Sequence, residues 1–194
     1  MEIVFATQNE HKIIEIRKIL GESYKIISLS DIGHFDELEE NHDNMEMNAL
    51  QKARFIYQNY QKNCFADDSG LEIEALNGRP GVNSARYAGL DKDMNANMEK
   101  VLEEMKGNQD RKAQFRTVIA LVLDGKDFLF DGVIKGSIFN QKRGNNGFGY
   151  DPIFIPEGYN QTFAEMTLEE KNKISHRAKA IGKMVQFLRG FSLI

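Results

Sequence analysis

The chain of 194 residues contains a single cysteine, Cys64, and has no excess of positive charge. One cysteine cannot form an internal disulfide or a cysteine-based metal site, so we expect Cys64 to pack in the core. The formal net charge of −4 disfavours a protein that coats nucleic acid, because such a protein needs a broad Lys/Arg surface. A pocket for a small phosphorylated ligand is still allowed, since it needs only a few local donors.

The sequence also lacks a long apolar segment. The apolar run at residues 3–6 is too short for a secretory signal and has no basic start, so we expect a cytoplasmic protein that is not in a membrane. No Walker P-loop, Rossmann fingerprint, HExxH or GxSxG motif is present. Ordinary shares of hydrophobic residues (41%) and charged residues (28%) favour a globular protein, with residues 1–194 as a single domain that has room for two lobes.

The stretch at residues 65–70 places two adjacent carboxylates, Asp67 and Asp68, between an apolar approach and Gly70. This pattern is typical of a strand that delivers acids to the edge of a site. Successive side chains of a strand point to opposite faces, so both carboxylates can face one ligand only if the strand breaks there. One of the two is therefore expected to be the working acid. A turn that opens with Asp and Ser is the alternative.

Residues 2–6 predict a short strand, and apolar residues between Ile13 and Leu20 follow helical spacing. Asn9 is a natural N-cap between the two elements, and Lys12 follows it by one turn. Because a helix start exposes backbone N–H groups and the positive end of a dipole, this turn can bind phosphate. Ordinary capping beside a solvated lysine is the alternative.

The rest of the chain alternates between helical and strand patterns. Asp124-Gly125 predicts a tight turn between two antiparallel strands. The expected strands are 24–29, 115–123 and 128–138, the expected helices are 44–62, 93–106 and about 175–188, and the expected loops are 33–43, 71–89 and 140–151.

Two of these segments carry candidate binding residues. In the loop at 140–151, the rings of Phe148 and Tyr150 lie among glycines, and they either stack on a base or pack in the core. His176 and Arg177 follow Ser175, the expected N-cap of the last helix. The helix dipole disfavours cations in this first turn, so the two residues either bind a ligand or form surface ion pairs.

Six blocks of residues follow one another along the chain. They are Thr7-x-Asn9-x-x-Lys12, Glu40 before Asn48-Ala49-x-x-Lys52-Ala53, Ala66-Asp67-Asp68-Ser69-Gly70-Leu71, Pro80-Gly81-Val82-x-Ser84-Ala85-Arg86-Tyr87, Gly147-Phe148-Gly149-Tyr150-Asp151-Pro152 and Ser175-His176-Arg177. With these blocks in this order, the sequence resembles the inosine/xanthosine triphosphate pyrophosphatase family over nearly the whole chain. Gln8 departs from the family pattern, which commonly has glycine there, and Met47 stands where an acid is frequent.

The resemblance implies an α/β fold with an elongated mixed β-sheet flanked by helices, and two lobes around a central cleft. It implies a homodimer that depends on Mg²⁺. The implied reaction is the hydrolysis of deaminated purine nucleoside triphosphates (ITP, dITP and XTP) to the nucleoside monophosphate and pyrophosphate, which keeps these nucleotides out of DNA and RNA. No stable nucleic-acid partner is expected.

Carried onto this sequence, the resemblance makes Asp68 the catalytic base, and Glu40 and Asp68 the Mg²⁺ ligands. Asp67 is expected to support Asp68, and the neighbouring acids leave the metal-ligand set open between Glu39 and Glu40 and between Asp67 and Asp68. The implied substrate-binding residues are Thr7, Gln8, Asn9, Glu10, His11, Lys12, Lys52, Ser69, Phe148, Gly149, Tyr150, Asp151, Lys171, His176 and Arg177.

Base choice is a problem of hydrogen bonding. Inosine and xanthosine present an acceptor at C6, where adenine presents a donor, so donors such as His176 and Arg177 would disfavour adenine. Two other functions stay open at this point. One is a Maf-like pyrophosphatase that prefers pyrimidine triphosphates, and the other is a nucleotide sensor that binds without hydrolysis.

Overall fold

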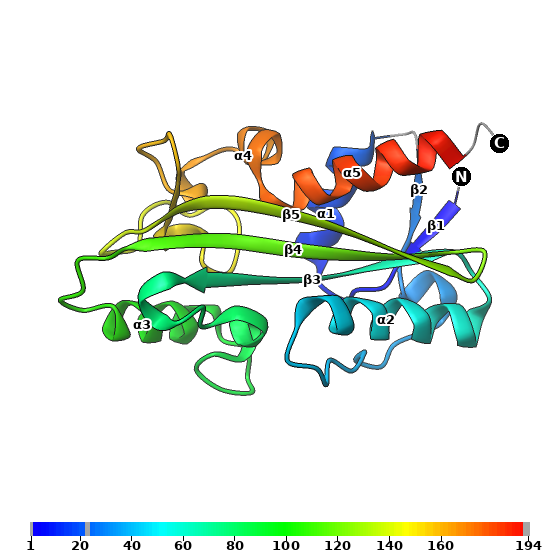
Figure 1. Cartoon of the computed structure of the whole chain (residues 1–194), viewed down its shortest axis with the longest axis horizontal. Coiled ribbons are helices and arrows are strands. Elements are labelled where there is room, and N and C mark those ends of the chain that lie inside the picture. The colour runs from blue at the N-terminus through cyan, green and yellow to red at the C-terminus, as the bar shows by residue number, and fades with distance from the viewer. Residues whose placement is uncertain (1, 22–23, 192–194) are drawn as a thin grey trace. The chain divides into compact units, whose positions relative to one another are not determined.

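The computed structural model describes residues 2–21 and 24–191 of the chain. Its strands form one mixed sheet in the order β2-β1-β3-β4-β5-β6, with helices flanking the strands (Figure 1). Strand β1 pairs in parallel with β2 and β3, whereas β5 and β6 are antiparallel. The strands are β1 (Glu2–Phe5), β2 (Lys25–Ile27), β3 (Cys64–Ile73), β4 (Lys112–Leu123), β5 (Lys126–Ile138) and β6 (Phe154–Pro156), and the α-helices are α1 (Glu10–Leu20), α2 (Met45–Tyr60), α3 (Met94–Glu104), α4 (Leu168–Ile174) and α5 (His176–Phe191).

The chain divides into two compact units. Strands β3, β4 and β5 contribute residues to both of them. Unit 1 consists of Met1–Asp68, Thr117–Gly132 and Arg177–Ile194, and unit 2 consists of Ser69–Arg116 and Val133–His176. The assignment of residues 1–194 to a single domain stays a prediction. Within the part of the chain that the structure describes, no helix is both long and apolar enough to cross a bilayer.

The strands of unit 1 alternate their side chains between two cores. On β3, Phe65 lies in a core with apolar residues of α1 and α5, whereas Cys64 and Ala66 lie in a core with apolar residues of α2. Figure 1 shows α5 and α2 on opposite sides of these strands. Because the alternation has a period of two residues, the next two side chains, Asp67 and Asp68, are directed toward different helices. The predicted core position of Cys64 is confirmed.

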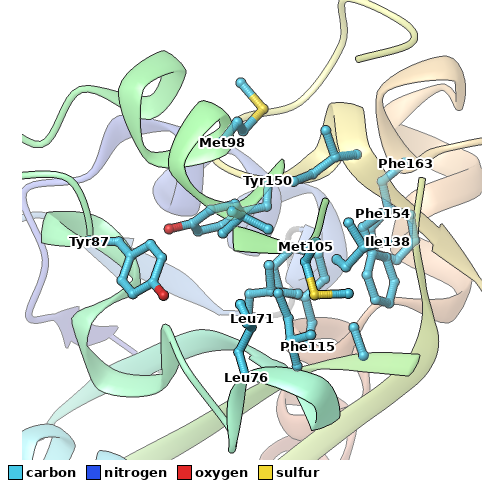
Figure 2. Close-up of a cluster of buried hydrophobic side chains, with 14 of the residues drawn as sticks. Leu71, Leu76, Tyr87, Met98, Met105, Phe115, Ile138, Tyr150, Phe154 and Phe163 are labelled. Carbon is cyan, nitrogen blue, oxygen red and sulfur yellow. The ribbon is translucent and has the colours of Figure 1, made fainter. Parts of the chain in front are cut away.

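Unit 2 has its own core, which is rich in aromatic residues. The rings of Phe115 and Phe154 lie with their centroids 4.6 Å apart, and Phe163 is 5.3 Å from Phe154. Figure 2 shows these side chains grouped with Ile138 and Met105, while Tyr87 and Tyr150 lie further along the same cluster. This core fixes the segments on either side of the glycine-rich loop at 140–151.

Most of the predicted elements are confirmed. The first strand, the helices at α1, α2, α3 and α5 and the hairpin at Asp124-Gly125 all occur, with positive φ at both turn residues. Three predictions need correction. Strand β3 runs on to Ile73, into the segment that was predicted as a loop at 71–89, β2 is shorter than predicted, and the 7-residue helix α4 lies before α5, where no helix was expected.

The continuation of β3 has a physical reason. Beyond the acids, Leu71 and Ile73 are fully buried in the core of unit 2, and the backbone N–H of Leu71 donates to Ser84 Oγ. Apolar burial therefore resumes directly after the polar residues and keeps the strand regular. The segment after Ile73 is not a plain loop either, because it contains two short 3₁₀ helices, Glu74–Leu76 and Gly81–Arg86.

Candidate active site

The turn between β1 and α1 has the predicted capping geometry. Asn9 Oδ1 accepts a hydrogen bond from the backbone N–H of Lys12 at 3.2 Å, and Thr7 Oγ1 accepts one from the N–H of Asn9 at 3.2 Å. Gln8, Asn9, Glu10 and His11 are exposed, whereas Thr7 and Lys12 are partly buried. The N-cap prediction is confirmed, and phosphate binding by this turn stays a prediction.

Gln8 connects this turn to the acidic segment at residues 33–43. Its Nε2 donates to the carbonyl oxygens of Phe35 and Asp36 at 2.7 and 2.8 Å. The glycine that is common in the family could not make this connection, because it has no side chain. The departure at Gln8 therefore tethers the segment that carries Glu40 to the predicted phosphate turn.

We expect Gln8→Met to lower the free energy of unfolding by about 1 kcal/mol, because two exposed hydrogen bonds are lost while the side-chain length is kept. Urea denaturation of the variant and the wild type measures this difference. Gln58→Met, on the exposed face of α2, is the matched control and should leave stability unchanged. Equal effects of the two substitutions would show that the tether has no energetic role.

Asp67 lies between two cations on the α1 and α5 side of the sheet. Its Oδ1 accepts from Lys12 Nζ at 2.9 Å, and its Oδ2 accepts from Arg177 Nε at 3.4 Å. Arg177, only 1% exposed, also pairs with Glu15 through Nη1. Burial alone would raise the pKa of Asp67, but Lys12 and Arg177 together hold that pKa well below its usual range. Asp67 is therefore a permanently ionised part of a buried charge network.

Asp68 lies on the α2 side of the sheet, where its environment is different. Its Oδ2 accepts from Asn48 Nδ2 at 3.0 Å. Burial raises the pKa of Asp68, the nearby Lys52 opposes that rise, and the net shift is upward. A carboxylate with a raised pKa is a stronger base at neutral pH than an ordinary surface aspartate.

Lys52 of α2 holds the segment with Glu40 close to β3. Its Nζ donates to Glu40 Oε1 and, at 2.6 Å, to the carbonyl oxygen of Asp67. Burial lowers the pKa of Lys52, but Glu40, Asp67 and Asp68 outweigh that effect and raise it above the usual value. Burial likewise raises the pKa of Glu40, while Lys52 more than offsets this, so the net shift is downward. Lys52 is thus a charged donor and Glu40 an ionised acceptor at neutral pH.

The donor set of unit 1 fits a magnesium ion that also contacts a substrate. In the described ranges 2–21 and 24–191, no group of three His, Cys, Asp or Glu side chains is placed to hold a metal ion by itself. Glu40 and Asp68 are near enough for Glu40 to raise the pKa of Asp68. Mg²⁺ commonly takes one or two carboxylates and completes its shell with phosphate oxygens and water. Two carboxylates without a third ligand match that pattern.

In unit 2 the predicted residues gather around Asp151. Its Oδ2 accepts from Lys171 Nζ at 2.6 Å and from the backbone N–H of Phe148 at 2.9 Å. A Cβ at Gly147 would come within 2.1 Å of that same oxygen, so only glycine allows the loop to pass so near. Asp151 and Lys171 therefore fix the conformation of the loop that carries Phe148.

The aromatic rings of the predicted binding residues in unit 2 differ in their burial and in their contacts. Phe148 is partly buried, and Lys171 Nζ is 4.9 Å from its ring centroid. The ring of His176 stacks on Phe115, with centroids 4.8 Å apart and planes 11° apart. Tyr150 belongs to the core of unit 2, and its hydroxyl donates to the carbonyl of Ser84 at 2.8 Å. Gly149 is partly buried in the same loop, and Ser69 is a partly buried residue of β3.

The sequence analysis gave no role to two residues that the geometry places among these groups. Glu15 is the buried partner of Arg177, and its only sequence signal is its position three residues after Lys12 on the same helix face. Asn48 contacts Asp68 directly, and it was quoted only as part of a motif. Side-chain amides occur throughout the chain, so nothing local to Asn48 marks it as special.

The sequence was compared with known families and proteins. Residues 3–187 match the Ham1 family. A dITP/XTP pyrophosphatase of Flavobacterium psychrophilum is 52% identical over 189 residues, which is 97% of this chain and 100% of the relative. The dITP/XTP pyrophosphatase of Bacillus subtilis is 46% identical over 191 residues, 96% of each chain.

Solved structures give the same result. The Ham1 protein of Staphylococcus aureus superposes with a TM-score of 0.89 at 41% identity, over 98% of this chain and 99% of that one. A HAM1 protein from Coxiella burnetii also reaches 0.89, at 38% identity and the same coverage. These similarities extend over both units of the fold.

Proposed function

The chain belongs to the Ham1 family, and we propose that it hydrolyses deaminated purine nucleoside triphosphates (ITP, dITP and XTP) to the nucleoside monophosphate and pyrophosphate. One observation carries this proposal. Two adjacent carboxylates on β3 have opposite pKa shifts, because Asp67 is neutralised by Lys12 and Arg177 while Asp68 is buried beside Asn48. When the pKa values of two neighbouring carboxylates differ in this way, the one with the lowered pKa stays an anion and the one with the raised pKa can act as a base.

The cations of unit 1 suit a triphosphate. A triphosphate repels an attacking nucleophile, so its charge must be neutralised where the bond breaks. Lys12 and Lys52 supply charge from α1 and α2, and the start of α1 adds the positive end of its helix dipole. We assign Thr7, Gln8, Asn9, Glu10, His11, Lys12, Lys52 and Ser69 to the phosphates and the sugar.

Asp68 is the proposed base. It takes a proton from a water molecule, whose oxygen forms a bond to the α-phosphorus as the bond from that phosphorus to the bridging oxygen breaks and pyrophosphate leaves. When Mg²⁺ is bound by Glu40 and Asp68, it supplies neutralisation of the phosphate oxygens and a lower pKa for a coordinated water.

The remaining predicted residues, which belong to unit 2 except for Arg177 of unit 1, are assigned to the base. Phe148 offers a partly buried ring face for stacking, and Tyr150 supports the loop from the core. Lys171, His176 and Arg177 are donors that suit a carbonyl at C6 of the purine, and Asp151 is an acceptor for a ring N–H. Against adenine, one donor left without a partner costs about 1–3 kcal/mol, or roughly 5- to 150-fold in discrimination.

Product analysis tests the proposal. Purified protein is incubated with ITP, XTP, GTP, ATP and dTTP, each with and without Mg²⁺, and the products are separated by chromatography. We expect IMP, XMP and pyrophosphate only when Mg²⁺ is present, with little product from the other three nucleotides. A preference for dTTP would favour an enzyme that acts on pyrimidine nucleotides. A nucleoside diphosphate together with orthophosphate would mean that the enzyme cleaves the bond between the β- and γ-phosphates instead. Saturable binding without any product would indicate a nucleotide sensor.

The same proposal includes a homodimer in the cytoplasm, where nucleoside triphosphates supply nucleic-acid synthesis. Sedimentation at several protein concentrations would measure the oligomeric state.

A further inference from the structure

Asn48 has three hydrogen bonds that together join two segments of unit 1. It is the fourth residue of α2 and is 3% exposed. Its Oδ1 accepts from the backbone N–H of His42 at 2.9 Å, and its Nδ2 donates to the carbonyl of His42 at 3.0 Å. The same Nδ2 donates to Asp68 Oδ2 at 3.0 Å. Every bond that this side chain makes is therefore directed at either His42 or Asp68.

One of these partners lies near a proposed metal ligand in the sequence, and the other is a proposed ligand. His42 lies two residues after Glu40 in the acidic segment, and Asp68 is itself a proposed ligand. We propose that Asn48 is a positioning residue that holds Glu40 and Asp68 at the spacing needed to bind Mg²⁺. This inference rests on the proposed function, since it takes its metal ligands from there.

The orientation of the Asn48 amide follows from the backbone. Because His42 offers an N–H on one side and a carbonyl on the other, Oδ1 must face the N–H, and Nδ2 must face the carbonyl. The second hydrogen of Nδ2 is then directed at Asp68. By donating to one oxygen, Asn48 sets the rotation of that carboxylate, and the rotation decides which oxygen faces a ligand.

An experiment can distinguish a purely structural role of Asn48 from a role in positioning the metal ligands, because the chain contains a second asparagine in a similar environment. Asn97 is the fourth residue of α3, is also 3% exposed, and holds the preceding loop by the same backbone pattern. Its Oδ1 accepts from the N–H of Ala88 at 2.6 Å, and its Nδ2 donates to the carbonyl of Ala85 at 3.0 Å. The bond to a carboxylate is what distinguishes Asn48 from Asn97.

The experiment compares Asn48→Leu with Asn97→Leu. Both variants lose two bonds to backbone and should lose similar stability in urea denaturation, but only Asn48→Leu also releases Asp68. The affinity for Mn²⁺, a paramagnetic substitute for Mg²⁺, is measured by electron paramagnetic resonance in the presence of the non-hydrolysable α,β-imido analogue of ITP. We expect Asn48→Leu to weaken Mn²⁺ binding about 10- to 100-fold, as for other residues that orient metal ligands, while Asn97→Leu changes it less than about 2-fold.

The kinetic consequence is a higher Mg²⁺ requirement for turnover in Asn48→Leu, with a smaller change in the KM for ITP at saturating Mg²⁺. Equal Mn²⁺ affinity in Asn48→Leu and wild type would overturn the inference, and so would equal losses of affinity in both variants. If Asn48→Leu does not fold, Asn48→Ser decides by the same measurements, because its short hydroxyl cannot reach both His42 and Asp68. A different result would contradict the proposed function itself, namely that the wild-type protein releases no pyrophosphate from ITP.

Discussion

Asp68→Asn should lower kcat for ITP by at least about 10³-fold, because the group that removes a proton from water is lost together with a carboxylate ligand for the metal. The fold should survive, since an asparagine at this position keeps an oxygen that can accept from Asn48. Turnover is measured at saturating Mg²⁺ by pyrophosphate release. Asp131→Asn is the control, because Asp131 forms an exposed ion pair with Lys183 on the surface of unit 1.

The stability of Asp68→Asn should also differ from that of the wild type in its dependence on pH. A raised pKa means that the folded state binds the proton of Asp68 more tightly than the unfolded state does. The carboxylate therefore reduces the stability of the fold as pH rises from the unfolded pKa, near 4, through the folded pKa. Between the unfolded and the folded pKa, the free energy of unfolding of Asp68→Asn should therefore rise relative to that of the wild type. In the kinetic measurement, near-normal turnover in Asp68→Asn would refute the role of Asp68 as the base.

The layout of unit 1 could be largely predicted from local patterns. The capping residue Asn9, the apolar spacing of α1 and α2 and the turn at Asp124-Gly125 are each determined by neighbouring residues, and the structure has all of them. The rule that adjacent strand residues face opposite sides also separated the two aspartates correctly. In the structure, β3 runs without a break through both aspartates.

What the local patterns missed depends on contacts between distant residues. Glu15 and Arg177 are 162 positions apart, so neither sequence neighbourhood reveals that the two side chains form a buried pair. Likewise, nothing in the sequence next to Gln8 reveals that its side-chain amide donates to carbonyls 27 and 28 positions away. The regularity of β3 beyond the acids depends on burial of Leu71 and Ile73 in a core built from later segments.

The two aspartates of β3 should therefore respond in opposite ways to the same substitution. Asp67→Asn should lower the free energy of unfolding by about 3–5 kcal/mol at pH 7, because it leaves Lys12 and Arg177 without their shared buried counter-charge. A neutral amide cannot replace the anion, and Glu15 alone does not balance both cations. Urea denaturation measures the loss, with Asp131→Asn again as the exposed control.

The pH dependence of Asp67→Asn identifies the cause of that loss. Because the pKa of Asp67 is held below its usual range, its contribution to stability is present above the unfolded pKa, near 4, and is lost as pH falls toward the folded value. The difference between wild type and Asp67→Asn should thus be constant between pH 5 and 7 and should narrow below about pH 4. If Asp67→Asn instead kept its stability and lost turnover as completely as Asp68→Asn, the roles of the two carboxylates would have to be exchanged.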